Sequence, residues 1–336
     1  MTPELKPMER INLILQRKET DRAAYINPVS AATVDSMRAT GAFFPEAHTN
    51  PDKMAALASA THDLCGLDSV APYFSVIVEA SALGCKIDFG SETAMPTVRG
   101  HIYKEPDEFA IPDDFFERPT VKCLLDSIRL LKAKYGDSAV VIGKVIGPWT
   151  LSYHLYGVQD FLADTIAEPE KVHGFLEAFR HLSLKLAVAQ AVAGADMITW
   201  ADHATGDLVS AAGYGEFLFP VHKKCVTELK RRLPRPTPII LHTCGNTIDR
   251  MDMFAETGFD VFHFDSKNDI DEAVRIAGGR IILAGGLNNP ETMLNGTPGD
   301  VRREVEMLKG KGIRLIAPEC ALSTLVPNEN LRAMVS

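Results

Sequence analysis

One histidine and two cysteines of this sequence have the types and the spacing of a catalytic metal site. His242 and Cys244 are two residues apart, and in an extended segment such side chains point to the same side. Cys320 lies 76 residues beyond Cys244, which excludes a compact zinc-finger knuckle but fits a third ligand from a later strand. Two thiolates and one imidazole favour zinc over magnesium or calcium, and three protein ligands leave a fourth position open for a substrate.

Asp265 is the acidic residue that could join this site. It follows the apolar run 259–264, and we predict that it acts in catalysis as a temporary fourth ligand, which holds the ion until a thiol arrives. A purely structural explanation stays open for all these residues. In that explanation His242 is a buried core histidine, the cysteines are small apolar fillers, and Asp265 is a loop or cap residue.

Weaker candidates follow other apolar runs of the sequence. Asp202 and His203 could orient a substrate or a ligand histidine, which makes Asp202 a second candidate catalytic residue. Gly147 stands at a tight turn where the backbone could approach a ligand, and Gly286 and Asn288 follow a later run. We predict cofactor binding by these last three residues, although packing explains the glycines and surface exposure explains the Asp-His pair equally well.

The segments that must position these residues alternate between short β-branched runs and longer helical patterns. From about residue 139 onward the expected strands are 139–144, 195–200, 238–243, 259–264, 281–284 and 313–317. The expected helices are 121–136, 168–193, 214–233, 248–257, 270–277 and 298–311. The first 120 residues are less regular and offer a helix at 7–18, a strand at 23–27, a helix at 51–65 and a strand at 68–73.

Apolar strands that alternate with helices indicate a parallel sheet, and at least six evenly spaced units indicate a closed barrel. We therefore predict an α/β fold, a (β/α)8 TIM barrel with an N-terminal helical extension, as a single domain over 1–336. In such a barrel the candidate residues meet at the carboxyl ends of the strands. A doubly wound open sheet is the alternative, but no Gly-x-Gly-x-x-Gly follows an early strand to support it.

The longest expected helix, 168–193, has apolar residues at mostly three-to-four-residue steps, which predicts one face against the sheet. These residues are Phe175, Phe179, Leu182, Leu186 and Val192.

Composition limits the kinds of partner. The formal charge of -9 disfavours binding to nucleic acid or to an anionic membrane surface, because both require a positive field. No stretch is apolar for long enough to span a membrane, and the first twelve residues carry charges where a signal peptide would be apolar. Six scattered cysteines do not make a disulfide framework, so we expect reduced thiols and a cytoplasmic protein.

Several motifs together resemble the methylcobamide:coenzyme M methyltransferase family, which is related to uroporphyrinogen decarboxylase. The resemblance runs along nearly the whole chain. The motifs are Pro45-Glu46-Ala47-His48-Thr49, Glu79-Ala80-x-x-x-Gly84-Cys85, Gly147-Pro148-x-Thr150-Leu151, Gly194-Ala195-Asp196, Leu241-His242-x-Cys244-Gly245-Asn246 and Ala317-Pro318-x-Cys320.

The resemblance implies a zinc site formed by His242, Cys244 and Cys320, with an acidic residue near the metal at Asp265. It further implies that a methyl group moves from methylcob(III)alamin, carried by a corrinoid partner protein, to a small thiol such as coenzyme M. Binding to zinc would remove the proton of the acceptor thiol and leave a nucleophilic sulfur.

The sequence departs from the family pattern in two places. Glu319 and Ala321 flank Cys320 where the family is usually glycine-rich, so the acceptor pocket is expected to differ. The segment Tyr25–Ser36 has no counterpart of the arginine-rich loop of uroporphyrinogen decarboxylase, which argues against tetrapyrrole decarboxylation. Decarboxylation, methyl transfer to tetrahydrofolate and a non-catalytic zinc scaffold remain as alternatives, and a homodimer is left open.

Overall fold

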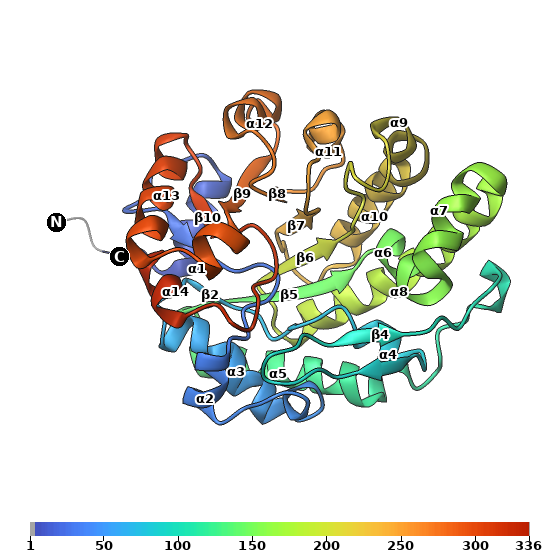
Figure 1. Ribbon diagram of the computed structural model, residues 1–336, viewed down its shortest axis with the longest axis horizontal. Coiled ribbons are helices and arrows are strands. Elements are labelled where there is room, and N and C mark those ends of the chain that lie inside the picture. The colour runs from blue at the N-terminus through green and yellow to red at the C-terminus, as the bar shows by residue number, and fades with distance from the viewer. Residues whose placement is uncertain (1–3, 336) are drawn as a thin grey trace.

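Eight parallel strands form the centre of the computed structural model, which describes residues 4–335 (Figure 1). In spatial order they are β1 (Ala24–Tyr25), β10 (Leu315–Pro318), β9 (Ile282–Leu287), β8 (Val261–Phe264), β7 (Ile239–His242), β6 (Met197–Ala201), β5 (Val140–Ile146) and β2 (Ser69–Val70). A backbone hydrogen bond of 2.7 Å from Asp68 N to Tyr25 O links the two end strands. The predicted (β/α)8 barrel is confirmed.

Helices cover the outside of this barrel in Figure 1. The main ones are α3 (Pro51–Asp63), α5 (Pro119–Tyr135), α8 (Pro169–Ala193), α10 (Phe219–Arg232), α11 (Met251–Glu256), α12 (Ile270–Ala277) and α13 (Pro298–Gly310). Shorter elements are α2 (Val34–Thr40), α4 (Val78–Ala82), α6 (Pro148–Ser152), α7 (Val158–Ala167), α9 (Ala211–Gly213), α14 (Asn328–Ala333) and the hairpin of β3 (Lys86–Asp88) and β4 (Thr97–Arg99).

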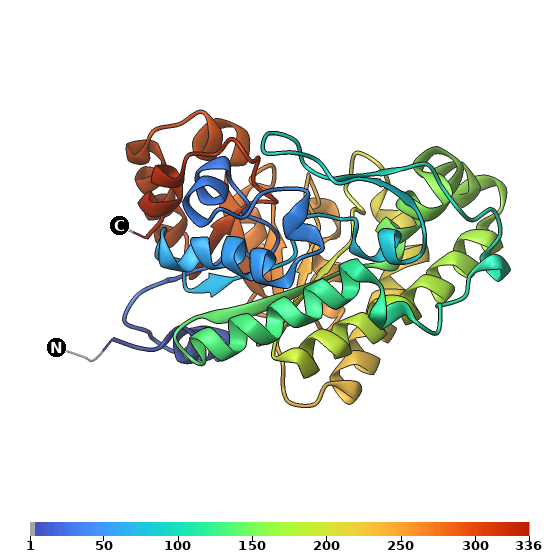
Figure 2. The same ribbon diagram turned by 90° about the horizontal axis from the view of Figure 1, so that it is seen from below.

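The predicted N-terminal extension is helix α1 (Pro7–Leu15), which closes the amino end of the barrel. Ile11 and Ile14 join the apolar cluster inside the strands, together with Val140 and Ile142 of β5. Figure 2 shows the blue N-terminal part of the chain beside the red C-terminal part, as the pairing of β1 with β10 requires.

The strand predictions agree with the structure to within a few residues. The strand expected at 195–200 begins later, at Met197, and the one expected at 281–284 continues to Leu287. The expectation for Val192 is wrong, because this side chain is 66% exposed near the end of α8 while Phe175, Phe179, Leu182 and Leu186 are buried. None of the helices that the structure describes is long and apolar enough to cross a bilayer.

Candidate metal centre

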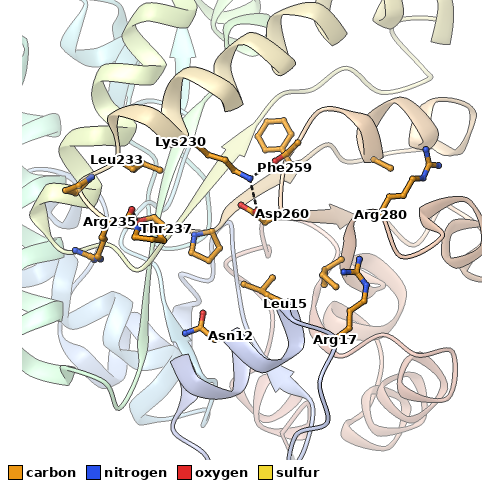
Figure 3. A pocket seen from close by; sticks show the side chains of 16 residues that line it. Asn12, Leu15, Arg17, Lys230, Leu233, Arg235, Thr237, Phe259, Asp260 and Arg280 are labelled. Carbon is orange, nitrogen blue, oxygen red and sulfur yellow. Dashed lines mark hydrogen bonds and ion pairs between the residues drawn. The ribbon is translucent and has the colours of Figure 1, made fainter.

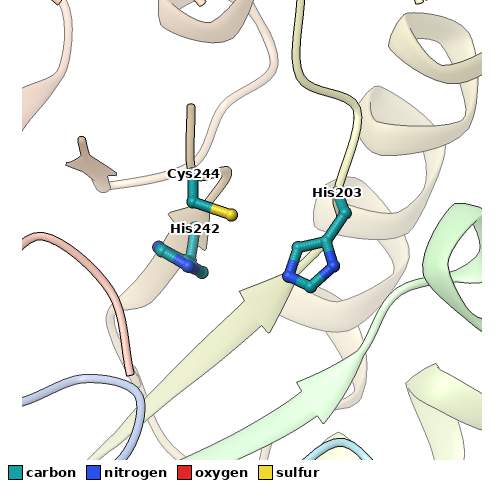
Figure 4. Close-up of side chains that lie close together, drawn as sticks. All are labelled: His203, His242 and Cys244. Carbon is teal, nitrogen blue, oxygen red and sulfur yellow. The ribbon is translucent and has the colours of Figure 1, made fainter. Parts of the chain in front are cut away.

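The three predicted metal ligands come together at the carboxyl end of the barrel. His242 is the last residue of β7, Cys244 follows two residues later, and Cys320 stands two residues beyond β10. Cys320 Sγ lies 3.5 Å from His242 Nε2. Ligand atoms of His242, Cys244 and a further residue, His203, all lie within 4.8 Å of one another. Figure 4 shows Cys244 above His242, with its sulfur directed toward the His203 side chain.

A neighbouring histidine orients the imidazole of His242. The rings of His263 and His242 meet through their Nδ1 atoms at 2.8 Å, because the two residues are register partners on β8 and β7. His263 Nε2 is 2.8 Å from the carbonyl oxygen of Pro318, so this nitrogen must donate. Burial lowers the pKa of His263 to about 3, so its ring is neutral and its Nδ1 accepts the proton of His242 Nδ1. The lone pair of His242 Nε2 is thereby left facing the cysteines.

The two cysteines influence each other's acidity. Their interaction raises the pKa of Cys244 and holds the pKa of Cys320 well below its ordinary value. Cys320 is therefore the more acidic of the two thiols. Ligation of a metal ion would require both sulfurs as thiolates.

This donor set fits zinc. The cluster brings together the imidazoles of His203 and His242 and the sulfur of Cys244, and the sulfur of Cys320 lies beside His242. Imidazoles and sulfurs are the ligands that zinc prefers over magnesium or calcium. Cys244, Cys320 and His203 are half-buried, whereas His242 is buried. The cluster is therefore open on one side, as a site that receives a substrate must be.

Asp202 is a buried residue that precedes His203 and holds the loop of the metal-ligand cluster. Its side chain is fully buried, and Oδ1 accepts a hydrogen bond from Thr150 N at 3.0 Å. Oδ2 is 2.9 Å from His222 Nε2 and 3.1 Å from Trp200 Nε1. Because both oxygens are hydrogen-bonded within the protein, Asp202 holds the loop that carries His203. This geometry favours a positioning role for Asp202 over direct contact with a substrate.

Gly147, predicted to bind a cofactor, makes room for Asp202. A Cβ atom at Gly147 would lie 1.9 Å from Asp202 Oδ2, so a side chain here would displace the carboxylate. Gly286 likewise has a φ of 87°, and a Cβ there would lie 2.8 Å from Leu308 Cδ2 and 2.9 Å from Phe264 Cζ. Asn288 accepts a hydrogen bond from Glu291 N and donates to Ser266 Oγ. These contacts account for all three residues by packing and loop structure, and cofactor binding by them stays a prediction.

Asp265 stands at the edge of the cluster. Its Oδ2 accepts from Gly245 N at 2.7 Å, and its Oδ1 accepts from Lys267 N at 2.9 Å. Both oxygens are thus tied to the loop after β8, although the charge still acts on Cys244. Asp265 is not among the residues His203, His242 and Cys244 whose ligand atoms lie within 4.8 Å of one another, and metal binding by it stays a prediction.

Glu319, the departure beside Cys320, connects three loops instead of lining a pocket. It is 6% exposed, and its two oxygens accept hydrogen bonds from Asn289 N at 2.9 Å and Ser266 N at 3.0 Å. Burial raises the pKa of this carboxyl. By joining the loops after β8, β9 and β10, Glu319 fixes the backbone that carries Cys320.

The sequence did not single out His263 or Lys144 as site residues. Both are polar residues within otherwise apolar strands. A polar residue at a position predicted to be buried is the sequence feature that could have identified them as site residues. Lys144 is 3% exposed on β5, and burial lowers its pKa to about 8, so it remains charged at neutral pH.

A hollow of about 820 Å³ lies at the opposite end of the barrel (Figure 3). It is bordered by α1 and by the segments that lead into β7, β8 and β9. Its cationic groups have partners within the protein: Lys230 Nζ is 2.8 Å from Asp260 Oδ1, and Arg235 Nη2 is 2.8 Å from the carbonyl oxygen of Ala195. The hollow shares no residue with the metal-ligand cluster.

Known proteins that resemble this chain include methyltransferases over almost its full length. The chain is 30% identical over 336 residues to the methylated-thiol–coenzyme M methyltransferase of Methanosarcina mazei, covering 100% of this chain and 89% of the relative. It is also 30% identical to the methylcobamide:CoM methyltransferase MtbA of Methanosarcina acetivorans, covering 99% and 97% of the two chains. A solved methyltransferase from Methanosarcina mazei superposes with a TM-score of 0.93 at 29% identity, covering 99% of this chain and 98% of the other.

More distant relatives share the barrel. Uroporphyrinogen decarboxylase from Chlorobium phaeobacteroides is 26% identical over 306 residues, which is 84% of each chain. The profile of uroporphyrinogen decarboxylase (URO-D) matches residues 6–336. The protein belongs to the URO-D family.

Proposed function

We propose that this protein transfers a methyl group from a methylated corrinoid, carried by a partner protein, to a small thiol such as coenzyme M, at a zinc ion held by His242, Cys244 and Cys320. The observation that carries the proposal is the convergence of an imidazole and two sulfurs on one open side of the barrel end. The names of relatives at 30% identity over almost the full chain support the same reaction.

The residues of the chain prepare the site for this reaction. His263 keeps the Nε2 lone pair of His242 free, and the pKa of Cys320 lies well below its ordinary value, so this thiol loses its proton readily when a cation binds. Zinc, when bound, lowers the pKa of an acceptor thiol so that it reacts as a thiolate at neutral pH. In the transfer the sulfur–carbon bond forms as the carbon–cobalt bond breaks, the electron pair stays on cobalt, and the thiol proton passes to solvent.

The fourth position at the metal has two candidates before the acceptor thiol arrives. Asp265 was predicted for it, but its oxygens are not among the ligand atoms that lie within 4.8 Å of one another. His203 is in that group, since its ring nitrogen lies within 4.8 Å of the ligand atoms of His242 and Cys244. We therefore propose His203 as the resting ligand, with Asp265 acting through the loop that carries Cys244.

Incubation with methylcobalamin tests the reaction directly. The zinc-loaded protein should convert methylcobalamin and 2-mercaptoethanesulfonate to cob(I)alamin and the methyl thioether, which is followed by cobalamin absorbance and by mass analysis of the product. Tetrahydrofolate and uroporphyrinogen serve as alternative substrates in parallel reactions. Transfer to tetrahydrofolate alone, or loss of carbon dioxide from uroporphyrinogen, would contradict the proposal.

A further inference from the structure

Lys144 is a charged side chain inside the barrel. Val140 and Ile142 of the same strand belong to the inner apolar cluster, and strand alternation sends Lys144 to the same side, one step nearer the carboxyl end. Lys144 is the register partner of Thr199 on β6, the strand whose carboxyl end leads into His203. The side chain is 3% exposed, and its charge also acts on Cys320 and on His203.

The neighbours of Lys144 leave its ammonium group without a hydrogen-bond acceptor. Nζ lies 4.4 Å from the centre of the Tyr73 ring, while the Tyr73 hydroxyl donates to Glu79 Oε2. Glu79 Oε1 accepts from Ile146 N at 2.9 Å, so protein donors engage both oxygens of this buried carboxyl group. Across residues 4–335, no atom accepts a hydrogen bond from Lys144 Nζ and no carboxylate pairs with it. The charge of Glu79 acts on Lys144 without forming an ion pair with it, so the N–H groups of the ammonium stay available for an anionic ligand.

We propose that Lys144 binds an anionic group, a sulfonate or a carboxylate, at the far end of the acceptor thiol. This inference rests on the methyl transfer proposed above. The acceptor has two ends to bind: its sulfur beside Cys320 and His203, and its anionic group at the buried ammonium of Lys144. The π face of Tyr73 holds the ammonium in place without neutralising it, which leaves its charge available to the ligand.

Three thiols that share a short carbon chain separate this account from a general electrostatic one. They are 2-mercaptoethanesulfonate, 3-mercaptopropionate and the neutral 2-mercaptoethanol, each tested with methylcobalamin and the zinc-loaded protein. The KM should be at least about tenfold lower for one or both anionic thiols than for 2-mercaptoethanol, the size expected for one charge-assisted hydrogen bond. Equal KM values for all three thiols would overturn the inference.

Substitution of Lys144 sharpens the same comparison. Lys144→Met should raise the KM for the preferred anionic thiol by about tenfold or more relative to the KM for 2-mercaptoethanol, so that the preference is lost. Lys144→Arg should restore part of the preference, and Lys122→Met, at an exposed position of α5, should leave it intact. If Lys144→Met slows all three thiols by the same factor, the lysine acts on the metal-ligand cluster and the inference fails.

A binding measurement keeps the test independent of turnover and of the variant. Calorimetric titration of the zinc-loaded wild-type protein with ethanesulfonate and with propionate, which lack the thiol, should give binding that is lost in Lys144→Met. Absence of binding by both anions would overturn the inference. Failure of the zinc-loaded wild-type protein to methylate any of the three thiols contradicts the proposed function itself, and this outcome is distinct from methylation without preference.

Discussion

The two ends of the barrel treat charged groups in opposite ways. At the amino end, Arg10 is fully buried, yet its guanidinium bonds to Asp68 at 2.9 Å and to Asp21 at 2.7 Å, and Arg22 bonds to the other oxygen of Asp68 at 2.8 Å. At the carboxyl end, the Lys144 ammonium lies over the ring of Tyr73, and no carboxylate within residues 4–335 forms an ion pair with it.

A buried hydroxyl group at the carboxyl end shows the same contrast. Among the residues that the structure describes, the buried Thr243 hydroxyl between His242 and Cys244 also has no hydrogen-bond partner. The ion pairs of Arg10 at the amino end therefore contribute to stability. At the carboxyl end, Lys144 and Thr243 keep polar groups available for ligands, as expected for TIM barrels, which place their active sites at this end.

The largest effect should come from Cys320→Ala. Removal of one of the two sulfurs should lower methyl transfer by more than about 100-fold, above the range typical of groups that only orient a ligand, because the metal is no longer held in an active geometry. Zinc content and activity are measured together with a thermal melt, which should change little. Cys123→Ala, at a buried cysteine on α5, is the matched control and should keep both zinc and activity. A Cys320→Ala protein that is fully active without zinc would contradict the role of the carboxyl end in metal-dependent chemistry.

At the other end, Asp68→Ala should cost stability and not chemistry. It leaves the buried guanidinium of Arg10 without one of its partners, and breaking a buried ion pair costs about 3–5 kcal/mol. Urea unfolding should report this loss, while zinc affinity of the folded protein should stay unchanged. An equal loss of stability in Lys144→Met would contradict the contrast, since Lys144 has no ion pair in the described part of the chain to lose.

His263→Phe should weaken zinc binding by about 10–100-fold, because the ring of His242 then has no acceptor to fix its proton on Nδ1. Competition with a chromogenic chelator measures the affinity. His263→Gln provides the control, since an amide can accept from His242 and donate to Pro318, and it should recover much of the affinity. Unchanged affinity in His263→Phe would show that the neighbouring ring does not orient the ligand.

The smallest effect is a fall in stability in weak acid. Burial lowers the pKa of His48 and of His154 to about 4, so each is neutral in the folded protein and takes up a proton on unfolding below about pH 6.5. The contribution is fully present above that pH and should fall by at most roughly 1.4 kcal/mol for each group between pH 6.5 and 5.5. Urea unfolding at several pH values measures it, and His48→Phe should make the slope shallower.

Sequence patterns predicted the barrel because its strands are long apolar runs that alternate with helices. The two-residue strands β1 and β2 could be expected but not delimited, since so short a segment depends on the neighbours with which it pairs. The triad of His242, Cys244 and Cys320 could be predicted because all three follow strands whose carboxyl ends must share one rim.

Other site residues depend on contacts that span long stretches of sequence. His203 approaches the cluster because its backbone N–H donates to Thr150 Oγ1 at 2.7 Å, a contact across 53 residues. The pairing of His263 with His242 depends on the register between β8 and β7, and a shift of one residue would turn the ring outward. For Lys144, only the folded barrel shows that the described residues provide no hydrogen-bond acceptor for the ammonium group.

Zinc X-ray absorption of the purified protein, recorded before and after addition of 2-mercaptoethanesulfonate, tests the central claim most directly. We expect about one zinc ion per chain with two sulfur ligands and the remainder nitrogen or oxygen, and a third sulfur ligand when the thiol is added. A zinc ion whose sulfur coordination does not change on addition of the thiol, or a fully active protein without zinc, would contradict the account.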